Sequence, residues 1–129
     1  MVLNLALSYG SRQEILRAVR AVAEDYKSNK LSKKELKKFS QEDFSKYLYT
    51  ADLPEPDLMI RTGGDIRISN FLLWQMAYTE MYFTETLWPD FTINELHEVI
   101  NVFSSVERRF GLEKSSKKIK TDKHGASLC

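Results

Sequence analysis

Two arginines flank a glycine pair in the segment Arg61–Asn70, where residues capable of chemistry are densest in the sequence. Gly63 and Gly64 allow backbone amides to approach a ligand closely, and each guanidinium offers a planar fork that matches phosphate oxygens. Ser69 or Asn70 can cap a following helix, whose amino terminus favours anions. The pattern therefore indicates a phosphate or diphosphate site.

A structural interpretation of the same segment is equally open. The arginines can instead form ion pairs with Asp57, Asp65 or Glu80 and so stabilise a tight turn. The segment is also not a Walker A loop, because it lacks the terminal Gly-Lys-Ser/Thr of that motif.

Glu80 is the second residue that suggests chemistry, because nearly all of its neighbours between Met76 and Phe83 are apolar or aromatic. A carboxylate in such surroundings requires a partner. Magnesium commonly takes one or two protein carboxylates and completes its octahedron with water and phosphate oxygens, so Glu80 is a candidate magnesium ligand. The alternative is a glutamate that is exposed or paired with an arginine.

Composition and charge restrict the class of protein. The 129 residues suffice for one domain, and 43% hydrophobic with 29% charged residues is typical of a globular fold. A net charge of +1 gives no reason to expect a nucleic-acid partner. The single cysteine, Cys129, the lack of a secretory signal and the short apolar runs favour a cytoplasmic protein without a transmembrane segment.

The amino-terminal part of the chain predicts a strand followed by a helix. The apolar run Val2–Leu7 is short and ends in a turn, as expected of a buried strand. Ser11 and Glu14 form a capping-box pattern at the start of a helix that continues to Tyr26. Residues 27–38 contain six lysines and predict a solvated connection or a short exposed helix, with a phosphate or lipid-headgroup patch as the alternative.

The rest of the sequence alternates helices and strands. Ser40 resembles a second helix cap, and Leu58–Arg61 is a compact strand that ends at the glycine pair. Residues 71–82 predict a buried helix that changes into a strand near its end. Thr92 caps a last helix that Gly111 ends. This order predicts an α/β fold with a mainly parallel sheet flanked by helices, in which ligands bind at the carboxyl ends of strands.

Several segments together resemble the carboxy-terminal half of cis-prenyltransferases of the undecaprenyl diphosphate synthase type. They match motifs of that family, in family order, over residues 3–111. The matching segments are Pro56-Asp57-Leu58, Ile60-Arg61-Thr62-Gly63-Gly64, Arg67-Ile68-Ser69-Asn70-Phe71-Leu72-Leu73-Trp74-Gln75, Glu80-Met81-Tyr82-Phe83, Leu87-Trp88-Pro89-Asp90-Phe91 and Arg108-Arg109-Phe110-Gly111.

The resemblance implies an activity and a set of site residues. Members of the family condense isopentenyl diphosphate with an allylic diphosphate, use Mg²⁺, work as homodimers and release a membrane-associated product, which puts the enzyme in the cytoplasm or at the membrane periphery. By resemblance, isopentenyl diphosphate is bound by Arg61, Arg67, Ile68 and Ser69. Glu80 is implied to bind magnesium in the partner subunit's site, which Arg109 and Gly111 assist.

The sequence also departs from the family pattern. Asp65 replaces the more usual glutamate, and Ile66 stands where some members carry a histidine. The amino-terminal half of the family, with its Asp-Gly-Asn-Gly-Arg-Trp-Ala motif and the magnesium-binding aspartate, has no counterpart here. Residues 1–112 therefore resemble a partial domain without its catalytic residues, and residues 113–129 form a basic tail that we expect to be disordered.

Three interpretations follow from this partial match. The first is a truncated or split isoprenyl transferase. The second is a non-catalytic partner subunit of a heteromeric cis-prenyltransferase, although such a subunit need not keep Arg61 and Arg67. The third is a diphosphate-binding or interaction module, which predicts no role for Glu80.

Overall fold

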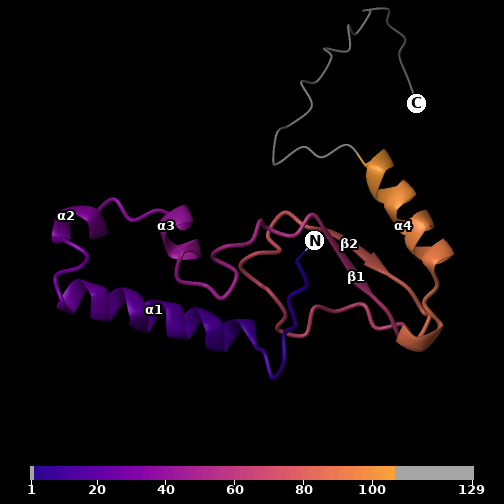
Figure 1. Cartoon of the computed structure of the whole chain (residues 1–129), viewed down its shortest axis with the longest axis horizontal. Coiled ribbons are helices and arrows are strands. Elements are labelled where there is room, and N and C mark those ends of the chain that lie inside the picture. Colours follow the sequence, from indigo (N-terminus) through magenta and orange to yellow (C-terminus); the bar gives the residue numbers. More distant parts are fainter. Residues whose placement is uncertain (1, 107–129) are drawn as a thin grey trace, which may run out of the picture.

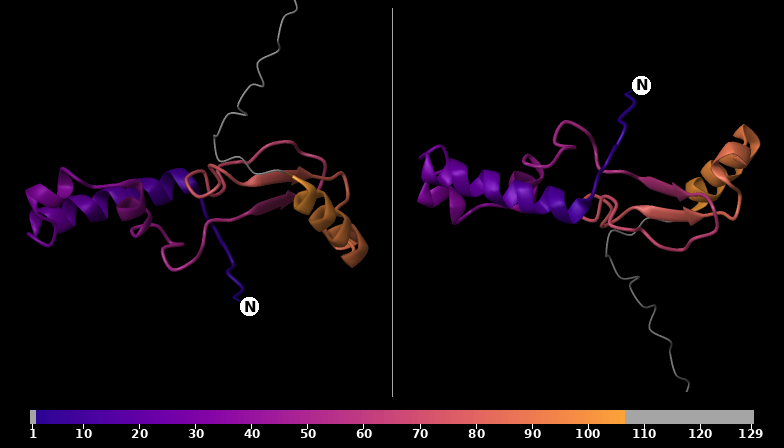
Figure 2. Two further views of the ribbon diagram at one scale, coloured as in Figure 1. Left: turned by 90° about the horizontal axis from the view of Figure 1, so that it is seen from above. Right: turned by 90° about the horizontal axis from the view of Figure 1, so that it is seen from below.

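The computed structural model describes residues 2–106 (Figure 1). Helix α1 and two short helices lie at one end of an elongated molecule, two strands lie toward the middle, and the last helix lies at the other end (Figures 1 and 2). The elements are α1 (Ser11–Lys27), α2 (Lys33–Leu36), α3 (Gln41–Ser45), β1 (Leu58–Arg61), β2 (Glu80–Phe83), a 3₁₀ turn η1 (Trp88–Asp90) and α4 (Ile93–Ser105).

The two strands form a parallel sheet, as predicted for an α/β fold. Leu58 pairs with Glu80 and Arg61 pairs with Phe83, so the carboxyl ends of both strands meet at one edge. Pairing continues beyond the strands, because the amide of Thr84 donates to the carbonyl of Arg61 at 2.9 Å. The residues that follow β1 and β2 are therefore held side by side.

Helix α1 begins as predicted but is capped differently. Its N-cap is Gly10, and Ser11 is its first residue, so the predicted capping box between Ser11 and Glu14 is wrong. Asn70 caps the helix from elsewhere in the chain: its backbone carbonyl accepts from the amide of Ser11 at 2.8 Å, and its Oδ1 accepts from the amide of Arg12 at 2.9 Å. A local sequence pattern cannot reveal a cap that comes from so far along the chain.

The helix predicted to start at residue 71 is absent, and residues 71–78 form bends and turns. Ser69, Asn70 and Leu72 have positive φ angles of 46°, 62° and 43°, which are incompatible with a right-handed helix at these positions. The amide of Leu73 donates to Ser11 Oγ at 2.9 Å instead of to a preceding carbonyl. The predicted change to strand structure near residue 81 is correct, since β2 spans Glu80–Phe83.

The predicted strand at Val2–Leu7 is also wrong. Residues 2–6 have no regular secondary structure, and the side chains of Val2, Leu3, Leu5 and Leu7 are 70–83% exposed. A strand requires backbone partners along an edge, and no strand in residues 2–106 pairs with this segment.

The remaining helices agree with the sequence-based expectations apart from one end. Ser40 caps α3 with a full capping box, and Thr92 Oγ1 accepts from the amide of Glu95 at the start of α4. The lysine-rich segment contains the short exposed helix α2. Helix α4 ends at Ser105, several residues before the predicted end at Gly111, and Val106 already has extended backbone.

The apolar core of the described residues is small. Its buried apolar side chains are Ala18, Leu48, Met76 and Val99. The rings of Phe44 and Trp74 add an aromatic contact, with centroids 4.5 Å apart, and Trp74 Nε1 donates to Ser45 Oγ at 3.0 Å. Within residues 2–106, none of the helices combines the length and the apolar character that crossing a bilayer demands.

Candidate substrate-binding site

Arg61, at the carboxyl end of β1, organises the loop that follows it. Its Nη1 donates to the backbone carbonyl of Arg67 and to Ser69 Oγ, the latter at 3.1 Å. Its Nη2 lies 3.4 Å from Asp65 Oδ2. The guanidinium thus bridges three points of one loop, a geometry that requires the planar, multiple-donor fork of arginine.

Arg67 meets Arg61 at the same carboxylate. Its Nη2 donates to Asp65 Oδ2, so one carboxylate oxygen lies between two guanidinium groups. Side-chain exposure differs between the two arginines, 25% for Arg61 and 62% for Arg67. The predicted ion pairing with Asp65 is therefore present, and it also brings two cations together at the surface.

A cavity of about 220 Å³ opens beside these arginines. All four residues predicted to bind isopentenyl diphosphate line it, namely Arg61, Arg67, Ile68 and Ser69. The rest of the lining consists of Met59, Ile60 and Phe71. The cavity therefore combines cationic and hydroxyl donors with an apolar wall, which suits a small molecule that has an anionic head and a hydrocarbon group.

The glycine pair does not present its amides to this cavity. The amide of Gly63 donates to the carbonyl of Thr86 and the amide of Gly64 to that of Thr84, both at 2.9 Å. The expectation that these amides would contact a ligand is therefore wrong. Glycine is needed here because both residues have strongly positive φ angles, 90° and 80°, while their donors join the two strand ends.

Glu80 lies away from the arginine cavity within one chain. It is the first residue of β2 and pairs with Leu58, whereas Arg61 ends β1, so three residues of strand, about 10 Å, separate their levels. Side chains alternate along a strand, so Glu80 and Arg61 also project from opposite faces of the sheet. If these two residues serve one reaction, they do so at different sites or in different subunits.

The donor set for a metal is incomplete in the described part of the chain. Residues 2–106 contain no group of three or more histidine, cysteine, aspartate or glutamate side chains placed to hold an ion. Glu80 itself is half-buried, and its carboxylate forms no ion pair within these residues. A single available carboxylate fits one ligand position of Mg²⁺, whose other positions water and phosphate oxygens can fill.

Two other predicted site residues, Arg109 and Gly111, lie outside the described residues. The basic tail, residues 113–129, lies there as well.

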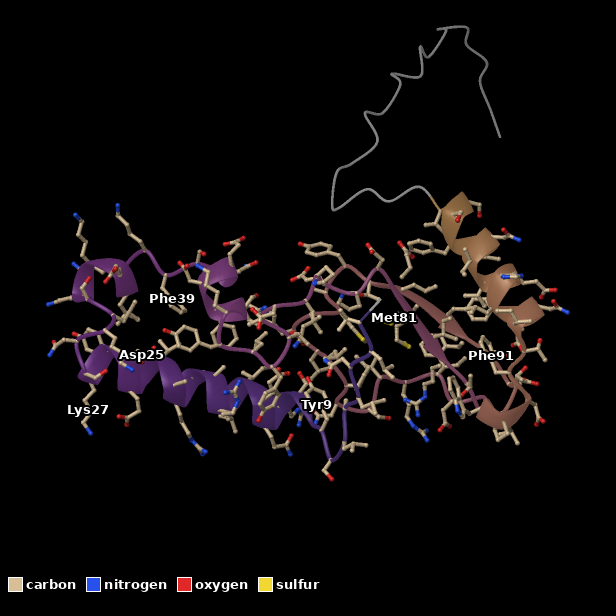
Figure 3. The ribbon with its side chains drawn as sticks, in the orientation of Figure 1. Tyr9, Asp25, Lys27, Phe39, Met81 and Phe91 are labelled. Carbon is tan, nitrogen blue, oxygen red and sulfur yellow. The ribbon has the colours of Figure 1, made fainter. Side chains whose placement is uncertain are left out.

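Sequence reasoning missed Glu14, a buried carboxylate near the start of α1 whose hydrogen-bond network adjoins the site. Glu14 is 1% exposed and accepts hydrogen bonds from the hydroxyl of Tyr9, the amide of Tyr49 at 2.7 Å and Gln75 Nε2 at 3.3 Å. Figure 3 shows Tyr9 next to the amino end of α1. Burial, together with the hydrogen bond to Glu14, raises the pKa of Tyr9 to about 12. The apolar spacing of the helix gave no sign that Glu14 faces inward.

This network adjoins the loop of the site. The Tyr9 ring packs edge-on against Phe71, with centroids 5.6 Å apart, and Phe71 lines the arginine cavity. The start of α1 thus fixes the loop through Asn70 and through the contact between Tyr9 and Phe71.

Comparison with known proteins identifies the family to which this chain belongs. The family model described as "Putative undecaprenyl diphosphate synthase" matches residues 1–111, and the chain belongs to this family. The chain is 50% identical over 111 residues to an isoprenyl transferase of Clostridium acetobutylicum. It is 52% identical over 112 residues to a ditrans,polycis-undecaprenyl-diphosphate synthase ((2E,6E)-farnesyl-diphosphate specific) of Xanthomonas axonopodis pv. citri.

The matches cover most of this chain but less than half of each relative. The alignments take in 86% of this chain and 43% of the C. acetobutylicum protein, and 87% and 42% for the X. axonopodis protein. The crystal structure of lavandulyl diphosphate synthase from Lavandula x intermedia in complex with dimethylallyl diphosphate superposes with a TM-score of 0.77 at 36% identity, over 84% of this chain and 45% of that one. A probable undecaprenyl diphosphate synthase from Campylobacter jejuni superposes with a TM-score of 0.67 at 44% identity, over 84% of this chain and 47% of that one.

Proposed function

We propose that this chain supplies the isopentenyl-diphosphate-binding part of a cis-prenyltransferase, which condenses isopentenyl diphosphate with an allylic diphosphate. The observation that carries the proposal is the cavity beside β1, which Arg61, Arg67, Ile68 and Ser69 line together. Family membership and the names of the relatives, isoprenyl transferase and undecaprenyl diphosphate synthase, support the same reaction class.

In this proposal each part of the substrate has its own contacts in the cavity. The diphosphate lies against Arg61, Arg67 and Ser69, since charge-assisted hydrogen bonds to phosphate oxygens are strong and directional. The five-carbon isopentenyl group lies along Ile68 and the apolar wall. In this orientation the chain fixes the nucleophilic alkene while the allylic substrate loses pyrophosphate, a contribution by positioning.

Glu80 contributes to a second site, in a homodimer. Its separation from the arginines, in level and in face, is what supports this assignment. The carboxylate would be one ligand of Mg²⁺ together with diphosphate oxygens. Bound Mg²⁺ would supply Lewis-acid stabilisation of the charge that develops on the leaving diphosphate. Arg109 and Gly111 are assigned to the same neighbouring site by their motif alone.

The 129-residue chain on its own is catalytically incomplete in this proposal, and the complete enzyme is placed in the cytoplasm or at the membrane periphery. A non-catalytic partner subunit is the competing possibility. The converging arginines favour substrate binding over that alternative, because a subunit without a substrate has no need of two cations around one small cavity.

Isothermal titration calorimetry with isopentenyl diphosphate tests the proposal. Arg67→Ala should weaken binding about 10-fold or more, because a hydrogen bond to a charged group contributes about 1.5–3 kcal/mol. Arg67 is more than half exposed, so its loss should leave the fold intact by circular dichroism. Arg20→Ala, at an exposed position of α1, is the matched control and should bind as the wild type does. Equal affinity of Arg67→Ala and wild type would refute the site.

A further inference from the structure

Six lysines lie together at the end of the molecule opposite α4. Lys27 ends α1, Lys30 follows in the connecting loop, and the others occupy α2 and the residues after it: Lys33, Lys34, Lys37 and Lys38. All six are exposed. Figures 1 and 3 show α2 and Lys27 at this end, with β1 and β2 beyond the other end of α1. We call residues 27–38 the lysine end.

The positive charge of the lysine end is hardly neutralised. Its one acidic residue, Glu35, is engaged by the backbone, because its carboxylate accepts from the amide of Ser32 at 2.8 Å in the capping box of α2. Lys30 lies 3.7 Å from Asp25, but its side chain is 74% exposed, so this pair is weak. Within residues 2–106, the other five lysines form no ion pair.

Apolar side chains emerge among these lysines. Leu36 on α2 is 38% exposed, and Tyr26 at the end of α1 is 42% exposed. Lys34 and Lys38 also line a hollow of about 540 Å³, together with Phe39, Tyr47 and the acidic residues Glu35 and Asp43. Lysine side chains can lay their methylene stems along such apolar surface while the ammonium groups reach outward.

We propose that the lysine end is a docking surface for an anionic lipid bilayer. A cluster of four to eight cations beside apolar side chains is the pattern that attracts acidic headgroups. The cluster contains lysine and no arginine; ammonium groups act as hydrated point charges that suit a diffuse plane of headgroup charge rather than bidentate recognition. The inference rests on the proposed function in one respect, since an enzyme that makes a long isoprenoid must release it into a membrane.

Vesicle co-sedimentation of the full 129-residue chain tests this docking. Vesicles of phosphatidylcholine with one third phosphatidylglycerol should bind the chain, vesicles of phosphatidylcholine alone should not, and 0.5 M NaCl should release it. A variant with Lys33, Lys34, Lys37 and Lys38 changed to glutamine should bind on the order of 600-fold more weakly, at about fivefold per lysine.

The matched control removes the same charge elsewhere in the sequence, with Lys114, Lys117, Lys118 and Lys120 changed to glutamine, and should retain most of the binding. Equal loss in both variants would overturn the proposal in favour of a net-charge effect. Binding to phosphatidylcholine alone, or to a labelled RNA oligonucleotide in preference to vesicles, would overturn it too. The variant with Lys33, Lys34, Lys37 and Lys38 changed to glutamine should bind isopentenyl diphosphate as the wild type does. A failure of membrane docking can therefore be distinguished from a failure of the proposed function.

Discussion

Asp65 holds the two arginines in place and also competes with any anion that they would bind. Its carboxylate lies between Arg61 and Arg67 at a partly exposed position, where an ion pair contributes at most about 1 kcal/mol. A diphosphate carries more charge and more acceptor oxygens than one carboxylate, so it can displace Asp65 from Arg67. Arg61 is held more firmly, because it also binds the Arg67 carbonyl and Ser69 Oγ.

Arg61→Lys therefore tests the geometry of the site separately from its charge. An ammonium group cannot bridge the three points that the guanidinium bridges, so we expect at least 10-fold weaker binding of isopentenyl diphosphate by calorimetry, although the charge is unchanged. The equivalent change at an exposed helical position, Arg20→Lys, should have no effect. Wild-type affinity in Arg61→Lys would mean that only the positive charge matters.

Tyr9 gives a pH-dependent readout of the buried network around Glu14. The pKa of Tyr9 is about 12 in the folded chain, against about 10 for an unfolded tyrosine. A raised folded-state pKa stabilises the fold fully below pH 10, and this contribution is lost as the pH rises from 10 to 12.

Urea unfolding followed between pH 9 and pH 11.5 should show this loss in the wild type. Tyr9→Phe should be less stable at pH 9 and should decline less steeply, because it has no hydroxyl to ionise. Other groups titrate in both proteins and cancel in the comparison. Parallel curves for the two proteins would show that the Tyr9 hydroxyl is not held by Glu14 in the folded chain.

At the scale of elements, Asn70 links helix α1 to the loop of the site. Its side chain caps α1, and its φ of 62° places it in the left-handed region, which asparagine tolerates better than most residues. Asn70→Ala should lower the free energy of unfolding by about 1–2 kcal/mol through the lost cap and the strained backbone. Asn70→Asp keeps the acceptor and should be close to wild type in thermal unfolding. Equal stability of Asn70→Ala and Asn70→Asp would show that the cap from residue 70 does not contribute to the free energy of unfolding.

Local sequence signals identified the elements whose causes are local. The caps at Ser40 and Thr92 and the strand Leu58–Arg61 depend on residues a few positions apart, and each was predicted. The failures depend on distant residues. The apolar run after residue 70 could not form a helix because Ser11 takes the amide of Leu73 and positive φ angles precede it, and neither is visible as periodicity.

The same distinction applies to the site. Arg61, Arg67, Ile68 and Ser69 were predicted as a group by their match to motifs of the family, and the structure places all four around one cavity. The amides of Gly63 and Gly64 were wrongly assigned to a ligand, since their acceptors lie beyond β2. Glu14 was missed because its three donors come from three separate segments.

At the scale of the whole molecule, residues 2–106 combine a sheet edge beside the arginine cavity with a short run of exposed apolar residues. The exposed run, Val2–Leu7, follows the alternation of a strand but has no strand partner within residues 2–106. Exposed apolar surface of this kind is typical of a face that other secondary structure covers. The chain spans less than half the length of the curated relatives it matches, so the remaining part of such a relative is the natural candidate to cover it.

Reconstitution measures the central claim most directly. The 129-residue chain is mixed with the segment of the C. acetobutylicum isoprenyl transferase that it does not match, and incorporation of labelled isopentenyl diphosphate into lipid is followed with farnesyl diphosphate and Mg²⁺. We expect no turnover from either polypeptide alone, measurable turnover from the mixture, and at least a 10-fold loss when the chain carries Arg67→Ala but not Arg20→Ala. Turnover by the chain alone, or turnover of the mixture that is insensitive to Arg67→Ala, would contradict the account.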